Sequence, residues 1–131
     1  MSDDTVQGLG GAFLYVDDLD GAAAWYRQHL GLELQSWGDS RGTVLPSMDR
    51  QPAGRMASTT FALFQAEKPL PEGVRTGRVN FRVRDLDGLV ARLQDAGVRT
   101  EALEDESFGR FVWAWDPEGN KVELWEPPPA E

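Results

Sequence analysis

Few side chains in this chain could carry out covalent chemistry. Among 131 residues there is no Cys and only one His, His29. The lack of Cys excludes disulfides, thiol nucleophiles and thiolate metal sites. We expect His29 to lie in the last turn of a helix, where a cation suits the helix dipole, rather than in a catalytic site. Ser58, Thr59 and Thr60 have no base partner that the sequence indicates, so nucleophilic catalysis has no support.

Carboxylates are more frequent, and two groups of them occupy similar places. Asp17, Asp18 and Asp20 precede one predicted helix, and Asp85 and Asp87 precede another. Paired carboxylates can do acid–base work. Aspartate at a helix start also accepts hydrogen bonds from the first free backbone N–H groups. Because both groups sit at helix starts, we interpret them as caps.

An internal repeat organises the elements around these caps. Val16-Asp-Asp-Leu-Asp-Gly21 matches Val83-Arg-Asp-Leu-Asp-Gly88, and Gly31-Leu32 matches Gly97-Val98 at nearly the same offset. Hydrophobic periodicity and turn residues predict one strand, one helix and three strands in each half. The expected strands cover 10–16, 32–37, 43–46, 58–65, 78–83, 98–103, 108–115 and 121–126, with a helix at about 20–30, a second from Asp85 or Asp87 to Gly97, and loops at 47–57 and 66–77.

Each predicted helix has one apolar stripe, so each must cover one face of a sheet. The stripes are Leu19, Ala23, Tyr26 and Leu30, then Leu86, Val90, Leu93 and Ala96. Alternation along the strands sends Ala12, Leu14, Val16, Val79, Phe81, Val83, Val122 and Leu124 toward the helices. The opposite, open face receives Gly11, Phe13, Tyr15, Arg78, Asn80, Arg82, Lys121, Glu123 and Trp125, joined by Phe111, Trp113 and Trp115. An aromatic face exposed to water must form a pocket, meet a second subunit, or do both.

Charge and hydropathy narrow the possible partners. The net charge is -9, and a protein that binds nucleic acid nonspecifically needs basic surface, so we expect no nucleic-acid partner. No apolar run approaches the length of a membrane span, and the acidic start MSDDTVQG has no secretory apolar core. We expect a cytoplasmic protein with no membrane partner.

Three segments resemble the vicinal oxygen chelate superfamily, which includes glyoxalase I, bleomycin-resistance proteins and extradiol dioxygenases. They are GGAFLYVDDLDGAAAWYRQHLGLEL, VNFRVRDLDGLVARLQDAGV and FGRFVWAWDPEGNKVELWEP. The resemblance implies an α+β fold in which two βαβββ modules form an eight-stranded, half-open cup. It predicts a single domain over 1–131, with modules at 8–66 and 77–128. It also implies a homodimer, since members are commonly dimers.

The family's metal site takes one ligand from the first and last strand of each module. Carried over by position, these ligands fall on Gly11, within Phe61 to Leu63, on Arg78 and on Glu123. Glu123 is the only surviving candidate ligand, and one carboxylate beside a guanidinium is a poor metal site. We therefore expect no metal and no cofactor, and an ion pair between Arg78 and Glu123.

The sequence thus favours a metal-free protein that binds a small apolar or aromatic molecule in an aromatic-lined cleft. The expected ligand-binding residues are Phe13, Tyr15, Arg78, Asn80, Arg82, Phe111, Trp113, Trp115, Glu123 and Trp125. The alternative is a glyoxalase-like lyase or isomerase, or a dioxygenase, in which Glu123 is catalytic with a cation or with Arg78. A third alternative is a dimer whose open faces serve mainly as an interface.

Overall fold

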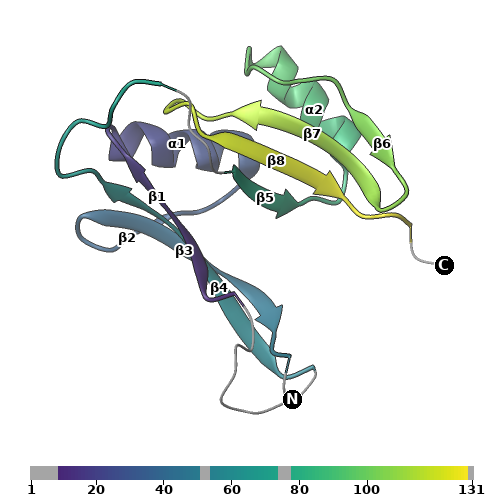
Figure 1. Ribbon diagram of the computed structural model, residues 1–131, viewed down its shortest axis with the longest axis horizontal. Coiled ribbons are helices and arrows are strands. Elements are labelled where there is room, and N and C mark those ends of the chain that lie inside the picture. The colour runs from purple at the N-terminus through teal and green to yellow at the C-terminus, as the bar shows by residue number, and fades with distance from the viewer. Residues whose placement is uncertain (1–8, 51–53, 74–77, 130–131) are drawn as a thin grey trace. The chain divides into compact units, whose positions relative to one another are not determined.

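The computed structural model describes residues 9–50, 54–73 and 78–129, which fall into two compact units, residues 1–70 and 71–131. Each unit follows the path βαβββ (Figure 1). This is the α+β arrangement of two repeated modules that the sequence predicts. None of the described helices is long and apolar enough to cross a membrane. The predicted start of the second module, residue 77, lies outside the described residues.

Unit 1 contains the first helix and four strands. They are β1 (Gly11–Val16), α1 (Leu19–Leu30), β2 (Gln35–Ser36), β3 (Ser40–Met48) and β4 (Met56–Gln65). The sheet order is β1-β4-β3-β2, with β1 parallel to β4 and the other pairs antiparallel. Because β1 pairs only with residues 60–65, the first four residues of β4 extend past it, paired with β3.

Unit 2 repeats this topology. It contains β5 (Arg78–Arg82), α2 (Leu86–Asp95), β6 (Glu104–Glu106), β7 (Gly109–Trp115) and β8 (Lys121–Glu126). The sheet order is β5-β8-β7-β6, again with the first and last strands parallel. The repeat in the sequence is therefore a repeat of topology, with β1 matching β5 and β4 matching β8.

Both helices begin as the sequence predicts, and the structure identifies the capping residues. The Asp18 carboxylate accepts the Gly21 N–H at 3.0 Å, and the Asp85 carboxylate accepts the Gly88 N–H at 3.1 Å. The second Asp of each repeat has a different role. Asp20 pairs with Arg41 at 3.1 Å, and Asp87 pairs with Arg110 at 2.8 Å. The interpretation as caps is confirmed for Asp18 and Asp85 and is wrong for Asp20 and Asp87, whose carboxylates form ion pairs with arginines.

The buried core of each unit lies between its helix and one sheet face. Leu19, Ala22 and Tyr26 are the buried residues of α1, and Leu86, Leu89 and Leu93 are those of α2. They pack with Val16, Phe61 and Leu63 in unit 1 and with Val112, Ala114, Val122 and Leu124 in unit 2. The expected stripes were partly wrong, since Ala22 and Leu89 are buried in place of Ala23 and Val90, and Ala96 is exposed.

Three predicted segments differ from the structure. The strand expected at 32–37 is reduced to β2, and Trp37 lies outside it. The strand expected at 98–103 is only an isolated bridge between Thr100 and Ala114, and β6 begins at Glu104. The strand predicted at 43–46 is longer in the structure, where β3 covers Ser40–Met48. Since β3 ends at Met48 and β4 begins at Met56, both ends of the loop expected at 47–57 belong to strands. Residues 51–53 of that loop lie outside the described residues.

The turn from 116 to 120 joins β7 to β8. The buried Asp116 accepts hydrogen bonds from the backbone N–H groups of Glu118 and Asn120, at 2.9 and 2.8 Å, and from the Asn120 side chain at 2.9 Å. Gly119 has a φ of 82°, which glycine adopts without strain. The Asp-Pro-Glu-Gly-Asn segment is thus explained by turn geometry.

Candidate functional site

The open face of unit 2 carries most of the expected site residues. Strand register places Asn80 beside Glu123 and Glu123 beside Trp113, so these three side chains form one row across the sheet. Since directly paired residues point to the same face, two further rows lie parallel to it. They are Arg78–Lys121–Trp115 and Arg82–Trp125–Phe111.

An ion pair occupies the centre of this face. Nε of Arg78 lies 2.9 Å from Oε2 of Glu123, which confirms the pair expected from the sequence. Glu123 is only 8% exposed, whereas more than half of the Arg78 side chain is exposed. A carboxylate this deeply buried is costly without a charged partner, and Arg78 supplies that partner.

Cations also lie against the indole rings of β7. Nζ of Lys121 is 3.7 Å from the ring centroid of Trp113, and Cζ of Arg99 is 3.9 Å from that of Trp115. Both distances are well inside the range of a cation–π interaction. Sequence reasoning placed Lys121 on this face without assigning it to the site, and it missed Arg99. Arg99 was missed because the sequence predicts a regular strand at 98–103, which the structure reduces to an isolated bridge at Thr100.

Two indole N–H groups on this face differ in their partners. Nε1 of Trp125 donates to the Phe108 carbonyl at 3.0 Å. Nε1 of Trp113 is buried and has no hydrogen-bond partner among the described residues. A buried donor without an acceptor is uncommon in folded proteins.

The open face of unit 1 has a different chemistry. Phe13 and Tyr15 project from β1 beside Phe64 of β4, with ring centroids 5.7 and 5.9 Å from that of Phe64. A side chain at Gly11 would meet the Phe13 ring and the Thr60 carbonyl oxygen, both at 2.7 Å. The position where the resemblance implies a metal ligand therefore has no room for one.

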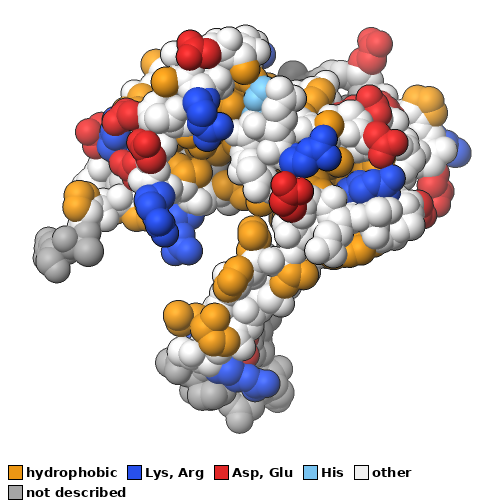
Figure 2. Space-filling view, turned by 180° about the vertical axis from the view of Figure 1, so that it is seen from behind, with side chains coloured by type: hydrophobic (Ala, Val, Ile, Leu, Met, Phe, Trp, Pro, Cys, Tyr) orange, Lys and Arg blue, Asp and Glu red, His pale blue; other side chains and the backbone are white. Residues whose placement is uncertain are grey.

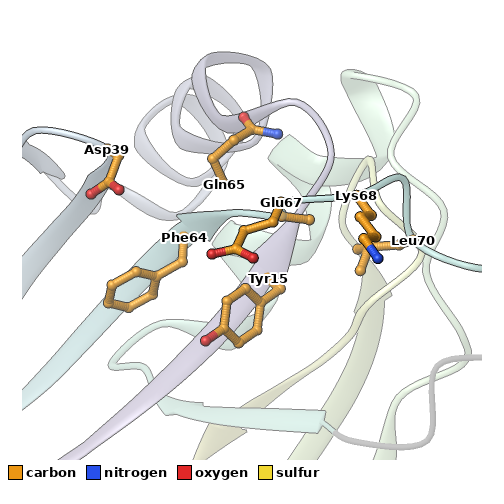
Figure 3. A pocket seen from close by; sticks show the side chains of 8 residues that line it. Tyr15, Asp39, Phe64, Gln65, Glu67, Lys68 and Leu70 are labelled. Carbon is orange, nitrogen blue, oxygen red and sulfur yellow. The ribbon is translucent and has the colours of Figure 1, made fainter.

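A hollow of about 560 Å³ lies at the end of β1 and β4 in unit 1. Tyr15 and Phe64 form its aromatic wall, and Asp39, Glu67 and Lys68 add charges of both signs. Figure 3 shows the two rings pointing the same way from neighbouring strands, with the Glu67 carboxylate directed toward them. Of these residues the sequence identified Tyr15 alone. The internal repeat was a signal for Phe64, which matches Trp125 in the second module.

The residues present do not fit a divalent metal. Strand register identifies Ala62 as the fourth-strand position of unit 1 that matches Glu123, so the four implied ligand positions hold Gly11, Ala62, Arg78 and Glu123. Glu123 already pairs with Arg78. No group of three or more His, Asp or Glu side chains that could hold a metal occurs among the residues described.

His29 lies in α1, away from these positions in the sequence. The centroid of its ring is 5.4 Å from that of Trp25.

Comparison with known proteins identifies the family. Residues 8–124 match the model of the Glyoxalase/Bleomycin resistance protein/Dioxygenase superfamily. A lactoylglutathione lyase from Agrobacterium tumefaciens is 27% identical, with a TM-score of 0.63 over 91% of this chain and 92% of that one. TnmS3, an antibiotic binding protein from Streptomyces sp. CB03234, is 26% identical, with a TM-score of 0.65 over 98% and 99% of the two chains.

More distant structures share the fold alone. The oxidase ChaP-H1 is 20% identical, with a TM-score of 0.69 over 92% of this chain and 96% of that one. The search of curated proteins found no match. Because the family model covers most of the chain, and both modules have the predicted topology, the chain belongs to the vicinal oxygen chelate superfamily of glyoxalases, bleomycin-resistance proteins and dioxygenases.

Proposed function

We propose that this protein binds a small apolar or aromatic molecule in a concave, aromatic-lined cleft, without a catalytic metal. The observation that carries the proposal is the residue set at the four implied ligand positions. Gly11 and Ala62 offer no donor atom, and Arg78 neutralises Glu123 at 2.9 Å. Protein sites for divalent ions need several oxygen or nitrogen donors, which these positions do not supply.

Aromatic side chains support the binding role. The proposed contacts are Phe13 and Tyr15 in unit 1 and Phe111, Trp113, Trp115 and Trp125 in unit 2, with Arg78, Asn80, Arg82 and Glu123 orienting polar groups. Phe13 and Tyr15 are 54% and 62% exposed, which is unusual for residues so apolar. Ligand sites combine such surfaces with a few polar groups. TnmS3, described as an antibiotic binding protein, is similar over nearly its whole length.

Metal analysis tests the first half of this proposal. We expect purified protein to contain no stoichiometric zinc, nickel, manganese or iron. Added metal should also leave the melting temperature unchanged, because a ligand raises it only by binding the native state. A stoichiometric metal, or a melting temperature that rises with metal concentration, would overturn the metal-free proposal.

Fluorescence titration with small aromatic compounds tests the second half. We expect saturable quenching of tryptophan emission by some of these compounds. Trp113→Ala should weaken their binding by about tenfold, since aromatic side chains dominate such contacts. Trp25→Phe is the matched control, because Trp25 lies in α1 and contacts Tyr26 and His29. Equal losses in both variants would contradict the assignment, and the melting temperatures of both would show that they are folded.

A glyoxalase-like or dioxygenase activity is the second candidate. It is supported by the 27% identity to a lactoylglutathione lyase and by Glu123, a buried carboxylate that could act as an acid or base beside Arg78. Glu123→Gln separates the two functions. Under the binding proposal, neither the wild-type protein nor the variant turns over substrate. Turnover that is lost in Glu123→Gln would establish the enzyme.

The homodimer is also a proposal. Apolar residues of the β3–β4 hairpin, including Val44, Met48 and Met56, are more than half exposed, and Figure 2 shows hydrophobic side chains on this surface. A surface of this kind commonly marks an interface. The cytoplasmic location stays a prediction from the sequence.

A further inference from the structure

We propose that the open face of unit 2 selects an aromatic anion, a flat molecule that carries a carboxylate or a similar oxyanion. The inference rests on the proposed function, because it names the class of ligand for the same face. Its evidence is the set of contacts that the charged side chains of β5 and β8 make with each other and with the indole rings.

The first and last strands of unit 2, β5 and β8, hold an excess of cations on this face. Arg78 and Arg82 of β5 and Lys121 of β8 point to the open face, where Glu123 is the carboxylate of the same two strands. The chain as a whole has a net charge of -9. On these two strands, three cations around one carboxylate give a local charge opposite in sign to that of the whole chain.

Glu123 neutralises just one of these cations. It lies 2.9 Å from Arg78, while no carboxylate of the described chain lies within ion-pair distance of Arg82 or Lys121. The acidic residues beyond β7 lie at the outer edge of the sheet, where register places Glu104 and Glu106 on the same open face, beside Phe111 and Gly109. The Glu101 N–H donates to the Trp113 carbonyl at this edge. All three acidic side chains are exposed to solvent.

The arrangement of Lys121 and Arg78 leaves their charges available to a ligand. Nζ of Lys121 lies 3.7 Å from the Trp113 ring centroid, and a cation–π contact orients an ammonium without neutralising it. Arg78 uses Nε for Glu123, and the described residues provide no hydrogen bond to its two terminal nitrogens. A guanidinium edge of this kind matches the geometry of a carboxylate.

The aromatic rings determine the rest of the ligand. Trp113, Trp115 and Trp125 lie in adjacent rows with these cations, so a flat ring can contact an indole while its charged group reaches Arg78, Arg82 or Lys121. A cationic ring of the same size would meet like charges in two of the three rows.

Three probes with one aromatic body test this selectivity: 2-naphthoate, 2-naphthamide and 2-naphthylmethylammonium. Isothermal titration at neutral pH should give an affinity for naphthoate about tenfold or more above that for the amide, and weaker binding still for the ammonium compound. The double variant Arg82→Gln/Lys121→Gln should remove most of the difference in affinity between naphthoate and the amide. Arg92→Gln is the control, because Arg92 is an exposed cation of α2.

Each outcome decides a specific question. If naphthamide or the ammonium compound binds as tightly as naphthoate, the anion inference is overturned and aromatic binding stands. If the preference for naphthoate survives the double variant, or is lost equally in Arg92→Gln, the assignment of the carboxylate to Arg82 and Lys121 is overturned. If none of the three binds, the inference falls together with the proposed function. Tighter binding of a single-stranded oligothymidine than of naphthoate would replace a small ligand with a nucleic acid.

Discussion

At the scale of single residues, Arg110 links the start of α2 to the end of β8. Its guanidinium donates two hydrogen bonds to Asp87, at 2.8 and 3.1 Å, and a longer one to Glu126 at 3.4 Å. Glu126 in turn accepts the Leu86 N–H at 2.8 Å. The hydrogen bond from Arg110 lowers the pKa of Asp87 below its ordinary value of 3.8, and the same contact raises the pKa of Arg110.

This contact predicts a stability difference that depends on pH. Asp87 has a lower pKa when folded than when unfolded, so its contribution is complete above the unfolded value near 4 and disappears as the pH falls through the folded value. Asp87→Asn should therefore lower the melting temperature at neutral pH, and the gap from wild type should close below about pH 4. Thermal melts across this range measure it.

The control for Asp87 is Asp95→Asn, which removes the same charge from an exposed residue at the other end of α2. A gap between wild type and Asp87→Asn that is as large in acid as at neutral pH would show that the carboxylate is not the source of the effect. Because the Asp87 side chain is 72% exposed, the gap should be modest and should shrink in high salt.

Residues of the candidate site were predictable to the extent that one rule determined them. The Arg78–Glu123 pair followed from the ligand positions that the family resemblance implies and from the cost of burying a lone charge. The lack of room for a side chain at Gly11 could not be predicted, because it depends on the side-chain conformation of Phe13 and on the position of the Thr60 carbonyl. The Lys121 contact with Trp113 likewise depends on the conformation of a long side chain, which periodicity does not determine.

At the scale of elements, the repeated Asp-Leu-Asp-Gly segment is a helix start in which the glycine makes room for the cap. A side chain on Gly21 would collide with the Asp18 carboxylate, and one on Gly88 with the Asp85 carboxylate. The same carboxylates accept the N–H groups of these glycines. Both glycines therefore serve the capping interaction, although glycine is otherwise unfavourable in a helix.

A double-mutant cycle tests this coupling in α2. Asp85→Ala should destabilise the protein by about 1 kcal/mol through loss of the cap. Gly88→Ala should be nearly neutral, because a gain of about 1 kcal/mol in helix propensity is offset by displacement of the carboxylate. In the Asp85→Ala background the same change should stabilise by about 1 kcal/mol, a coupling that denaturant unfolding can measure. Additive effects would contradict it.

Helices and the first and last strands of each unit were predicted well, and β2 and β6 poorly. The strands β1, β4, β5 and β8 each turn one face toward the core of their unit, so their hydrophobic pattern is strong. The segments after each helix lie at the outer edge, where β2 and β6 are fully exposed. Local strand propensity there is not reinforced by burial, which is why 32–37 and 98–103 were assigned too much strand.

At the scale of the whole molecule, the two units share one topology but differ in the chemistry of their open faces. That of unit 1 is apolar, with Phe13, Val44, Met48 and Met56 largely exposed. That of unit 2 is cationic, with Arg78, Arg82 and Lys121 beside the indoles. The repeat preserved helix starts and strand pairing while the open faces diverged, so the family could be recognised from sequence although the ligand could not.

The apolar face of unit 1 predicts self-association. Met48 and Met56 are paired in register at the end of the β3–β4 hairpin, 65% and 64% exposed, and Val44 lies on the same face at 53%. Covering apolar surface in an interface contributes roughly 25 cal/mol per Å², so a second copy of the chain should be favoured here. We expect sedimentation equilibrium to show a dimer. The double variant Met48→Gln/Met56→Gln should raise the dissociation constant of this dimer by about tenfold or more.

The matched control for the dimer is Ser47→Gln, because Ser47 pairs with Ala57 on the other face of the same hairpin. This variant should keep the dimer, whereas a surface effect unrelated to the face would weaken both. A wild-type monomer at high concentration would remove the interface altogether. Binding of the naphthoate probe separates the two faces further: if it is unchanged in the methionine variant, assembly depends on unit 1 and ligand selection on unit 2.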